Sequence, residues 1–432
     1  MTDPAPATAH TLELSEQRLP PSEHPVRNAA ISPLALTIVE RLRKEGHSAY
    51  VVGGCIRDLL LGNRPKDFDV ATAAKPEQVR QLFHRARIIG RRFRIVHVRS
   101  QRELVEVTTF RGEHHNRTGG THRSRRGRLL RDNVYGSLEE DAQRRDFSCN
   151  SLYFDTQSEE LLDFTGGLAD LRAGILRTIG DPARRFKEDP VRMLRALRFQ
   201  AKLGLKLDTD STRQLTQQAG LICDVPPARL ADEVVKLLLH QQAVAAYRLL
   251  RDSGLLAALF PTPAKLARQN PPHARLLEAA MQSTEQRIKE GGRTSAFFLY
   301  AALLWPAVEQ HYQRLRDSGR SPAAAMDEAS RAVLAEQSAR VAIGRFMHSL
   351  QDTWALQTQL PERNGDLTAH PRFRAAYNLL IMREQAGTDL QGLGDWWTQY
   401  QRDNPLPDRP PSHRPKPRHA PRHRRHHRPR TG

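Results

Sequence analysis

The feature that most constrains this chain is a pair of aspartates, Asp67 and Asp69, two residues apart and followed by Val70-Ala-Thr72. On a strand, alternate side chains point to the same face, so both carboxylates face one side while Phe68 and Val70 face the other. Paired carboxylates repel unless a cation lies between them, and such hard oxygen ligands suit Mg²⁺. An exposed polar strand edge would carry the same acids, but the apolar Phe68 and Val70 favour a strand with one buried face. The pattern predicts a metal-binding surface on a half-buried strand.

A third carboxylate, Glu106, lies inside the strand-like run 104–110. The run 95–98 precedes it across a polar turn, which predicts a β-hairpin. An acid among β-branched residues is unfavourable without a reason. One reason is a metal ligand that completes a two-metal site for in-line phosphoryl transfer. The other is a cross-strand ion pair with an arginine, and the residues alone leave both open.

A glycine turn precedes the aspartates. The strand-like run 49–52 ends at Gly53-Gly54, and a helical pattern that contains Arg57 follows. Glycines let backbone N–H groups approach a phosphate closely, and the N-terminus of a helix adds positive potential. Arg57, one turn into the helix, is placed to reach a triphosphate. Because a Gly-Gly turn between strand and helix is common, this motif does not decide the function by itself.

The second part of the chain is predicted to be helical from Asp189 onward. Asp189-Pro190 is typical of a helix start, with an N-cap and a proline at the first position. Arg192 and Arg195 share one helix face, and Arg229 and Glu233, four apart, share another. Further helical segments are expected at 228–239, 243–250, 274–288, 294–306, 322–347 and 371–383. In the first part, 33–46 is expected to form a helix that ends on Gly46, and 152–155 with 161–164 a second hairpin.

The charge indicates a polyanionic partner. The chain has 432 residues, a net charge of +19 and a pI near 10.5. Basic residues cluster in 113–133, interpreted as a mobile loop, and in the Pro- and His-rich tail, which favours nucleic acid over a role in solubility alone. Three scattered cysteines form no metal-ligand spacing and indicate a reducing, cytoplasmic setting. No apolar run reaches the ~20 residues needed to span a bilayer, and no signal peptide is recognised.

Several ordered motifs carry a resemblance to a known family. A glycine turn, a DxD pair and an acid on a later strand are the pattern of polymerase-β-like nucleotidyltransferases. The runs 144–150 (RRDFSCN), 180–199 (GDPARRFKEDPVRMLRALRF) and 228–233 (ARLADE) then follow in order. Over about 48–240 the chain resembles the bacterial class II branch, which holds CCA-adding tRNA nucleotidyltransferases and poly(A) polymerases.

The resemblance implies roles for residues of the first part. Gly53, Gly54 and Arg57 resemble the turn that holds the triphosphate. Asp67, Asp69 and Glu106 resemble the ligands of two Mg²⁺ ions. Asp146 and Asn150, with Arg145, resemble a motif that holds the ribose and supports the active site, and Asp146 is expected to be essential for activity.

It also implies how the base is chosen. Asp189 and Arg192 resemble the pair that reads the base edge, since a carboxylate and a guanidinium together supply acceptors and donors. Arg195 lies on the same helix face and joins the expected ATP-binding set. Arg229 and Glu233 resemble a helix pair that holds Arg192 or the nucleotide, although an ordinary surface ion pair would look the same.

The expected architecture is an α+β head with a small mixed sheet, then an all-α neck and body, and a disordered basic tail. The expected boundaries are 1–31 for a flexible leader, 32–178 for the head, 179–255 for the neck, 256–398 for the body and 399–432 for the tail.

The expected reaction is template-independent addition of AMP from ATP to RNA 3′ ends, as in bacterial mRNA polyadenylation that promotes RNA decay. The runs 90–98 and 132–146, which resemble the poly(A) branch, and the basic tail favour it. Two alternatives stay open: CCA addition to tRNA, and RNA binding by a protein with an inactive transferase head. Intact acids speak against the second.

Overall fold

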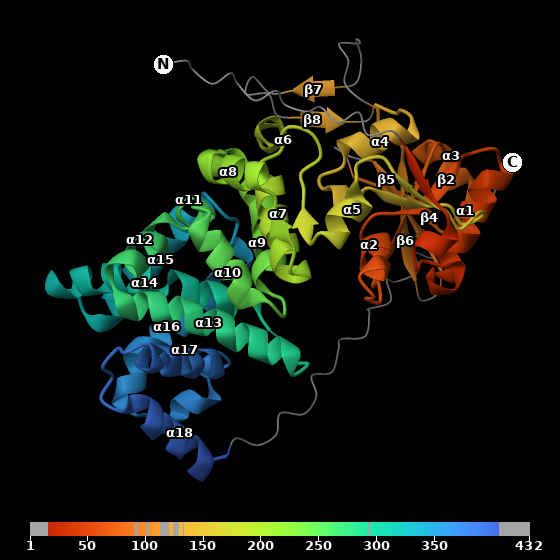
Figure 1. Cartoon of the computed structure of the whole chain (residues 1–432). Helices are drawn as coiled ribbons and strands as arrows, with labels where there is room; N and C mark the ends of the chain where they lie inside the picture. Colours follow the sequence, from red (N-terminus) through yellow and green to blue (C-terminus); the bar gives the residue numbers. More distant parts are fainter. Residues whose placement is uncertain are drawn as a thin grey trace, which may run out of the picture.

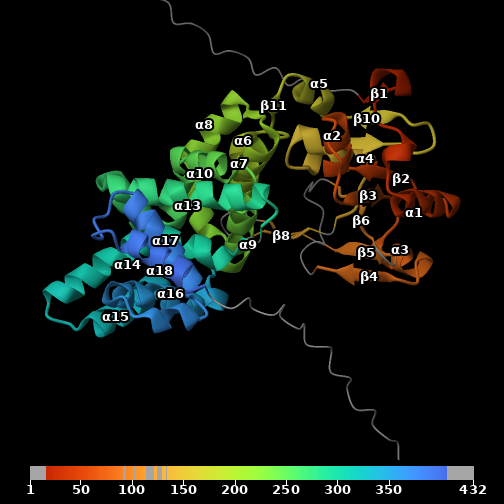
Figure 2. The ribbon, with the colours of Figure 1, turned by 90° about the horizontal axis from the view of Figure 1, so that it is seen from below.

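A computed structural model describes residues 16–90, 94–100, 103–112, 121–123, 129–132, 134–292 and 294–405 of the chain. A mixed α/β head is followed by a largely helical remainder, and the two lie side by side (Figures 1 and 2). This order agrees with the predicted α+β head and all-α neck and body.

The head is built on one sheet that contains eight strands among the described residues, in the order β1-β10-β9-β2-β3-β6-β5-β4. Neighbouring strands are antiparallel except β3 and β6, which are parallel. Both predicted hairpins are present, as β5–β6 and β9–β10. The strands span Gln17–Leu19 (β1), Ala49–Val52 (β2), Phe68–Thr72 (β3), Ala86–Ile89 (β4), Ile95–Arg99 (β5), Leu104–Thr109 (β6), Leu152–Phe154 (β9) and Leu161–Asp163 (β10).

Alternation along the strands gives the sheet two buried faces. Val51, Val70 and Val107 belong to a large core cluster that includes α1 and continues into the helical neck and body. Val52, Ala71 and Tyr153, on the other face, form a smaller cluster with Ala142 of α4. The head helices span Pro33–Lys44 (α1), Gly54–Leu60 (α2), Pro76–Leu82 (α3), Leu138–Arg144 (α4) and Gly167–Arg172 (α5).

The prediction of a flexible leader over 1–31 is wrong for its second half. Strand β1 pairs with β10 at the sheet edge, and the short 3-10 helices Pro21–Glu23 and Asn28–Ala30 follow. Val26 and Ile31 are buried in the main core. The ordered structure of this segment could not be predicted from its Pro-rich sequence. It arises from pairing at the sheet edge and burial against the head rather than from a local periodic pattern. The first 15 residues lie outside the described part.

The predicted mobile loop over 113–133 also needs a correction. Thr121–Arg123 (β7) and Leu129–Asp132 (β8) form a two-stranded antiparallel sheet. Residues 113–120, 124–128 and 133 lie outside the described residues. Strand pairing satisfies backbone groups without needing an apolar face, which is why the basic sequence carried no strand pattern.

The neck begins beside the head. Strand Ile175–Leu176 (β11) pairs in parallel with Lys206–Leu207 (β12), an interruption that the all-helical prediction missed. The neck helices span Pro182–Glu188 (α6), Val191–Leu203 (α7), Thr209–Gln218 (α8), Pro227–Leu238 (α9) and Ala243–Asp252 (α10). Asp189 is not the side-chain N-cap of α7. It ends α6, Pro190 occupies the N-cap position, and the Asp189 carboxylate is engaged elsewhere.

The body consists of helices that pack against one another. It comprises Leu255–Leu259 (α11), Pro261–Gln269 (α12), Pro271–Lys289 (α13), Ala296–Asp317 (α14), Pro322–Ser338 (α15), Met347–Gln359 (α16), Phe373–Gln385 (α17) and Leu393–Asp403 (α18). Short 3-10 helices lie in the head at Ser148–Asn150, in the neck at Ala219–Asp224, and in the body at Gly344–Phe346, Leu360–Glu362 and Gly365–Ala369. The single helix expected over 322–347 is two helices with a break after Ser338.

The end of the body differs from the prediction as well. Helix α18 continues to Asp403, so the tail cannot begin at 399 as expected. Trp397 is fully buried and packs edge-on against Phe373, which anchors α18 on α17. Residues 406–432 lie outside the described part. Within the described residues no helix is long and apolar enough to cross a membrane.

Candidate active site

The acids meet where β3 and β6 run in parallel. The register places Asp69 beside Glu106 on the neighbouring strand, and Asp67 immediately precedes β3. Phe68 and Val70 are buried in the main core, as the alternation predicted, while Asp69 and Glu106 are partly accessible. The fold therefore gathers at one sheet position three acids that lie up to 39 residues apart in the sequence.

The electrostatics of this position favour a cation. Burial, together with the Glu106 and Asp67 carboxylates, raises the pKa of Asp69 to about 6, against the opposing charge of Arg145. In the described part of the chain, no three His, Cys, Asp or Glu side chains stand as a preassembled metal cluster. What fits Mg²⁺ is the donor chemistry, since carboxylate oxygens that repel one another are relieved by a hard divalent ion.

Glu106 has a partner that the sequence analysis missed. His97 on β5 lies across from Glu106 in the antiparallel register, with His97 Nε2 3.1 Å from Glu106 Oε1. The expected alternative was a cross-strand arginine, whereas the partner found is a histidine. The predicted hairpin held the signal, because the two strands pair in a register that sets residue 97 opposite residue 106.

The glycine turn abuts the acids. Gly53 has φ 88°, a conformation that side chains disfavour, and it forms the N-cap of α2. A Cβ at Gly53 would lie 3.8 Å from Asp69 Oδ2 and 3.6 Å from Arg145 Nη1. The turn thus brings its backbone next to both the acidic pair and a cation.

Arg57 is not placed as expected. Its side chain is buried, donates to Asn150 Oδ1 at 2.5 Å and contacts Asp58. Its guanidinium also lies over the ring of Phe199 on α7. In this arrangement Arg57 joins α2 to Asn150 and to the neck rather than reaching into solvent for a triphosphate.

Arg145 is fixed by a buried network. Its Nη2 donates to Asp141 at 3.0 Å and its Nε to the Tyr153 hydroxyl at 2.8 Å, while that hydroxyl donates to Asp141 at 2.7 Å. Asp141 and Tyr153 are buried. They hold Arg145 beside Gly53 and Asp69. Neither was predicted from the sequence, although Asp141 lies four residues before Arg145, which ends α4 as its C-cap.

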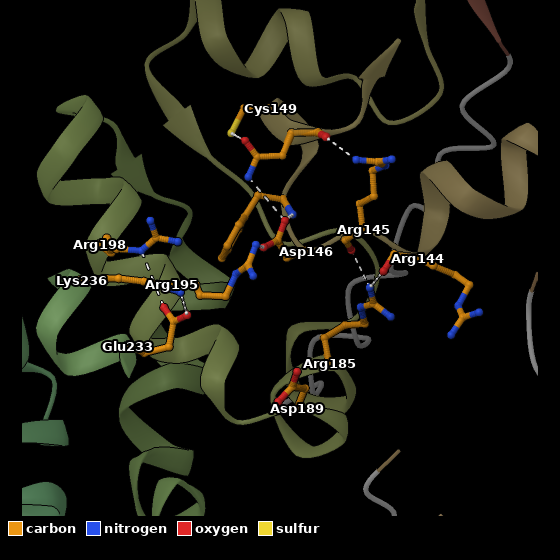
Figure 3. Close-up of polar contacts among 12 residues, drawn as sticks. Arg144, Arg145, Asp146, Cys149, Arg185, Asp189, Arg195, Arg198, Glu233 and Lys236 are labelled. Atoms are coloured by element: carbon orange, nitrogen blue, oxygen red, sulfur yellow. Dashed lines mark hydrogen bonds and ion pairs between the residues drawn. The ribbon is translucent and has the colours of Figure 1, made fainter. Parts of the chain in front are cut away.

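Asp146 joins head and neck (Figure 3). Its Oδ1 accepts from the Phe147 amide and from Asn150, and its Oδ2 lies 2.5 Å from Arg195 on α7. Burial alone would raise the pKa of Asp146, but Arg195 and Arg192 outweigh burial and hold the pKa below its ordinary value. Asp146 is therefore an ionised link between the two parts.

The base-reading set is arranged differently from the expectation. Arg229 binds Asp189 through two hydrogen bonds of 2.7 Å, and not Arg192. Arg192 donates instead to the Arg185 carbonyl. Glu233 contacts Lys236 at 3.1 Å and Arg198 at 3.8 Å. Figure 3 shows Asp189 and Glu233 on different parts of the neck.

Three family models match the chain in order. The Poly A polymerase head domain matches residues 49–177, the Probable RNA and SrmB- binding site of polymerase A matches 204–266, and the Polymerase A arginine-rich C-terminus matches 318–431. Poly(A) polymerase I of Escherichia coli O6:H1 (strain CFT073) is 42% identical over 404 residues, which cover 90% of this chain and 87% of that protein. The chain belongs to the poly(A) polymerase I family.

CCA-adding enzymes are more distant relatives of this poly(A) polymerase I family member. The CCA-adding enzyme of Geobacillus stearothermophilus is 38% identical over 225 residues, which cover 52% of this chain and 54% of that protein. The structure of the Bacillus stearothermophilus CCA-adding enzyme in complex with CTP superposes with a TM-score of 0.53 at 28% identity, covering 86% of this chain and 82% of that one. The fold is thus shared, while sequence similarity over nearly the whole chain is found with poly(A) polymerases. Enzymes of this nucleotidyltransferase family typically use Mg²⁺.

Proposed function

We propose that this chain is a template-independent polynucleotide adenylyltransferase that transfers AMP from ATP to the 3′ hydroxyl of RNA and releases pyrophosphate. The main support for this proposal is membership of the poly(A) polymerase I family. The acids beside the Gly53 turn are the proposed catalytic residues. The biological role that follows is polyadenylation of bacterial transcripts, which promotes their decay. A cytoplasmic site of action rests on three free cysteines, two of them buried.

Asp67, Asp69 and Glu106 would hold two Mg²⁺ ions. Bound there, Mg²⁺ would lower the pKa of the RNA 3′ hydroxyl and neutralise charge on the triphosphate. The chain's own contribution is positioning. The Gly53 turn offers a close backbone approach for phosphates, and Arg145 presents a fixed cation beside Asp69. The hydroxyl oxygen attacks the α-phosphorus in line, the bond to the β,γ-diphosphate breaks, and no covalent enzyme intermediate is needed.

Asp146 would keep the head and neck in register around the nucleotide. It is ionised, mostly buried and tied to both Asn150 and Arg195, so its side chain has little freedom. Because a misplacement of about 1 Å costs roughly a hundredfold in rate, loss of this link should abolish most of the activity even if Asp146 touches no metal.

Asp189 would read the base. Its two-point contact with Arg229 fixes the orientation of the carboxylate. A carboxylate held in this way can accept from the exocyclic amino group of adenine. This assignment differs from the sequence expectation in giving Arg229 the task of holding Asp189.

The test is primer extension by the full chain with Mg²⁺, each nucleoside triphosphate separately, and two acceptors: a generic single-stranded RNA and a tRNA that lacks its 3′ end. Long ladders with ATP alone on generic RNA support the proposal. Addition confined to C, C and A on tRNA would assign the chain to CCA addition. Tight RNA binding without extension would leave only an RNA-binding protein with an inactive head.

Variants Asp67→Asn and Asp69→Asn separate chemistry from binding. Each should reduce extension at least about a thousandfold, because a ligand of the reacting centre is lost, while RNA affinity stays within about twofold. A matched control is Asp210→Asn, an exposed aspartate on α8. Turnover close to wild type in both single variants would contradict the metal assignment.

A further inference from the structure

A cavity of about 200 Å³ opens in the helical body, away from the acids and outside residues 204–266. It lies between the C-terminal end of α13, the start of α14 and α17. In both ribbon views the C-terminal end of α13 reaches the side of the body nearer the head (Figures 1 and 2). An RNA whose 3′ end lies in the head can therefore run along this side.

The lining combines aromatic rings with cations. Phe297 and Phe298 at the start of α14 are half-buried, and Arg287 on α13 and Arg374 on α17 are exposed. Phe298 packs against the main core, whereas Phe297 does not belong to it. The Arg372 guanidinium lies 4.9 Å from the centroid of the Phe297 ring, so this ring is already part of a cation–aromatic stack. Such rings are the platforms on which nucleic-acid bases stack.

The cations at the cavity are not neutralised. No carboxylate lines it, and within the described residues Arg287, Arg372 and Arg374 form no ion pair. Arg374 makes a 3.5 Å contact with the Gln401 amide oxygen, and its guanidinium lies 5.6 Å from the centroid of the Tyr377 ring. An arginine without a carboxylate partner at a cavity mouth attracts anions, and phosphate is the anion that comes with a base.

The polar lining is open as well. Ser283, Ser295 and Asn378 make no side-chain hydrogen bond to another described residue, although each lines the cavity. Ser295 occupies the N-cap position of α14, but its hydroxyl makes no capping hydrogen bond. Hydroxyl and amide groups of this kind pair with base edges and with the ribose 2′ hydroxyl.

From these observations we propose that the cavity is a nucleotide-binding subsite for the RNA substrate, which holds one base of the strand upstream of the 3′ end. The base stacks on Phe297 and the adjoining phosphates contact Arg287 and Arg374. The volume of the cavity favours a single base of an RNA strand over a whole ATP molecule as the occupant. The cavity is smaller than the roughly 300 to 1,000 Å³ of sites that enclose a whole small molecule, which suits one base of a chain whose remainder stays outside. This inference rests on the proposed function, because it takes RNA as the substrate.

The first test measures RNA affinity by fluorescence anisotropy. The full chain is titrated, with EDTA present to prevent extension, into an oligoadenylate of about twenty nucleotides, longer than the roughly 4 to 16 that one binding module covers. Phe297→Leu keeps an apolar side chain but removes the ring, and should weaken binding roughly tenfold. Arg287→Gln and Arg374→Gln together should lower the salt dependence by about 0.7 in log–log slope for each lost phosphate contact.

The matched control is Arg331→Gln, an exposed arginine on α15 that is paired with Asp327. It changes the net charge by the same amount as each single arginine variant but removes no cavity residue. Unchanged thermal unfolding of Phe297→Leu is required alongside, so that weak binding is not caused by misfolding. Affinities of all cavity variants within twofold of Arg331→Gln would overturn the proposal.

The second test uses primer length. For a series of oligoadenylate primers, the cavity variants should raise KM only above a threshold length, with kcat and the KM for ATP unchanged. A raised KM for ATP at all primer lengths would instead show a free-nucleotide site and overturn the RNA assignment. The controls separate the two proposals: if the wild type extends no RNA, the proposed function fails, whereas an active wild type with indistinguishable variants refutes only this subsite.

Discussion

Arg229 on α9 donates one hydrogen bond of 2.7 Å to each carboxylate oxygen of Asp189, which lies between α6 and α7. This two-point contact fixes the plane of the carboxylate and joins helices whose residues stand 40 apart in the sequence. The proposed role of Asp189 in nucleotide selection can therefore be tested by replacing its partner Arg229.

Replacing Arg229 with glutamine should reduce selectivity for ATP. A charge-assisted hydrogen bond contributes about 1.5–3 kcal/mol, and the glutamine amide can still donate one of the two. Loss of one bond should lower kcat/KM for ATP roughly ten- to a hundredfold, and use of CTP should fall less. Primer extension with each nucleotide measures both effects. Arg213→Gln, an exposed arginine paired with Asp210 on α8, is the control. An unchanged ratio of ATP to CTP use would refute the role given to this pair.

Removing the Tyr153 hydroxyl should impair both stability and catalysis. Tyr153→Phe leaves buried Asp141 and Arg145 each without one partner, at a cost of about 1–3 kcal/mol in the free energy of unfolding. Since Arg145 then loses its fixed position beside Asp69, kcat should fall more than the KM for RNA rises. Urea denaturation and steady-state extension are the measurements. Tyr247→Phe, a buried tyrosine in α10, should leave kcat unchanged. A loss of stability with unaltered kcat would limit Tyr153 to a structural role.

Chelation of divalent ions should abolish extension, and Mg²⁺ should stabilise the fold through the acidic site. An ion that binds the native state at ten times its Kd adds about 1.4 kcal/mol. Mg²⁺ should therefore raise the unfolding temperature of the wild type but hardly that of Asp69→Asn, in which the repelling carboxylate is gone. Differential scanning fluorimetry with and without Mg²⁺ checks this, with Asp210→Asn as the exposed control. An equal rise in Asp69→Asn would place the stabilising ion elsewhere.

The N-terminal segment should loosen at acidic pH. His24 is buried, and burial followed by the charge of Arg27 lowers its pKa. The unfolded chain therefore binds this proton more readily than the folded one, so the stability that neutral His24 contributes is present above about pH 6.5 and decreases as pH falls below it. His24→Gln should unfold with a weaker pH dependence between pH 5 and 7, measured by urea titration. His84→Gln, an exposed histidine, should behave like the wild type, and identical pH profiles for both variants would refute the assignment.

Truncation after residue 405 should weaken RNA binding without loss of the head's chemistry. The removed segment carries nine Arg and Lys against one Asp. Each lost phosphate contact should lower the salt slope of binding to single strands by about 0.7. Extension of short primers at saturating RNA should persist. A scrambled tail of the same composition should restore affinity if its contacts are to phosphates alone, and a failure to restore would show that the order of residues matters.

The local pattern and the kind of chemistry can be inferred from the order of residues alone. Period-two alternation around Asp67 and Asp69, the hairpin that carries Glu106 and the glycine turn at Gly53 were all readable, because strand facing and turn conformation follow from neighbouring residues. The ordered motifs also identified the family. These features survive in the structure because each depends on interactions within a few residues.

Which side chains meet depends on the three-dimensional packing of the chain. The pairing of Asp189 with Arg229, the enclosure of Arg57 against Asn150, and His97 facing Glu106 all depend on how strands and helices far apart in sequence are brought together. The order of the segment 16–31 likewise comes from β1 adding to β10. A buried charge without a partner costs several kcal/mol, so each of these side chains needs the partner that the fold brings to it. A local sequence pattern does not show which partner that is.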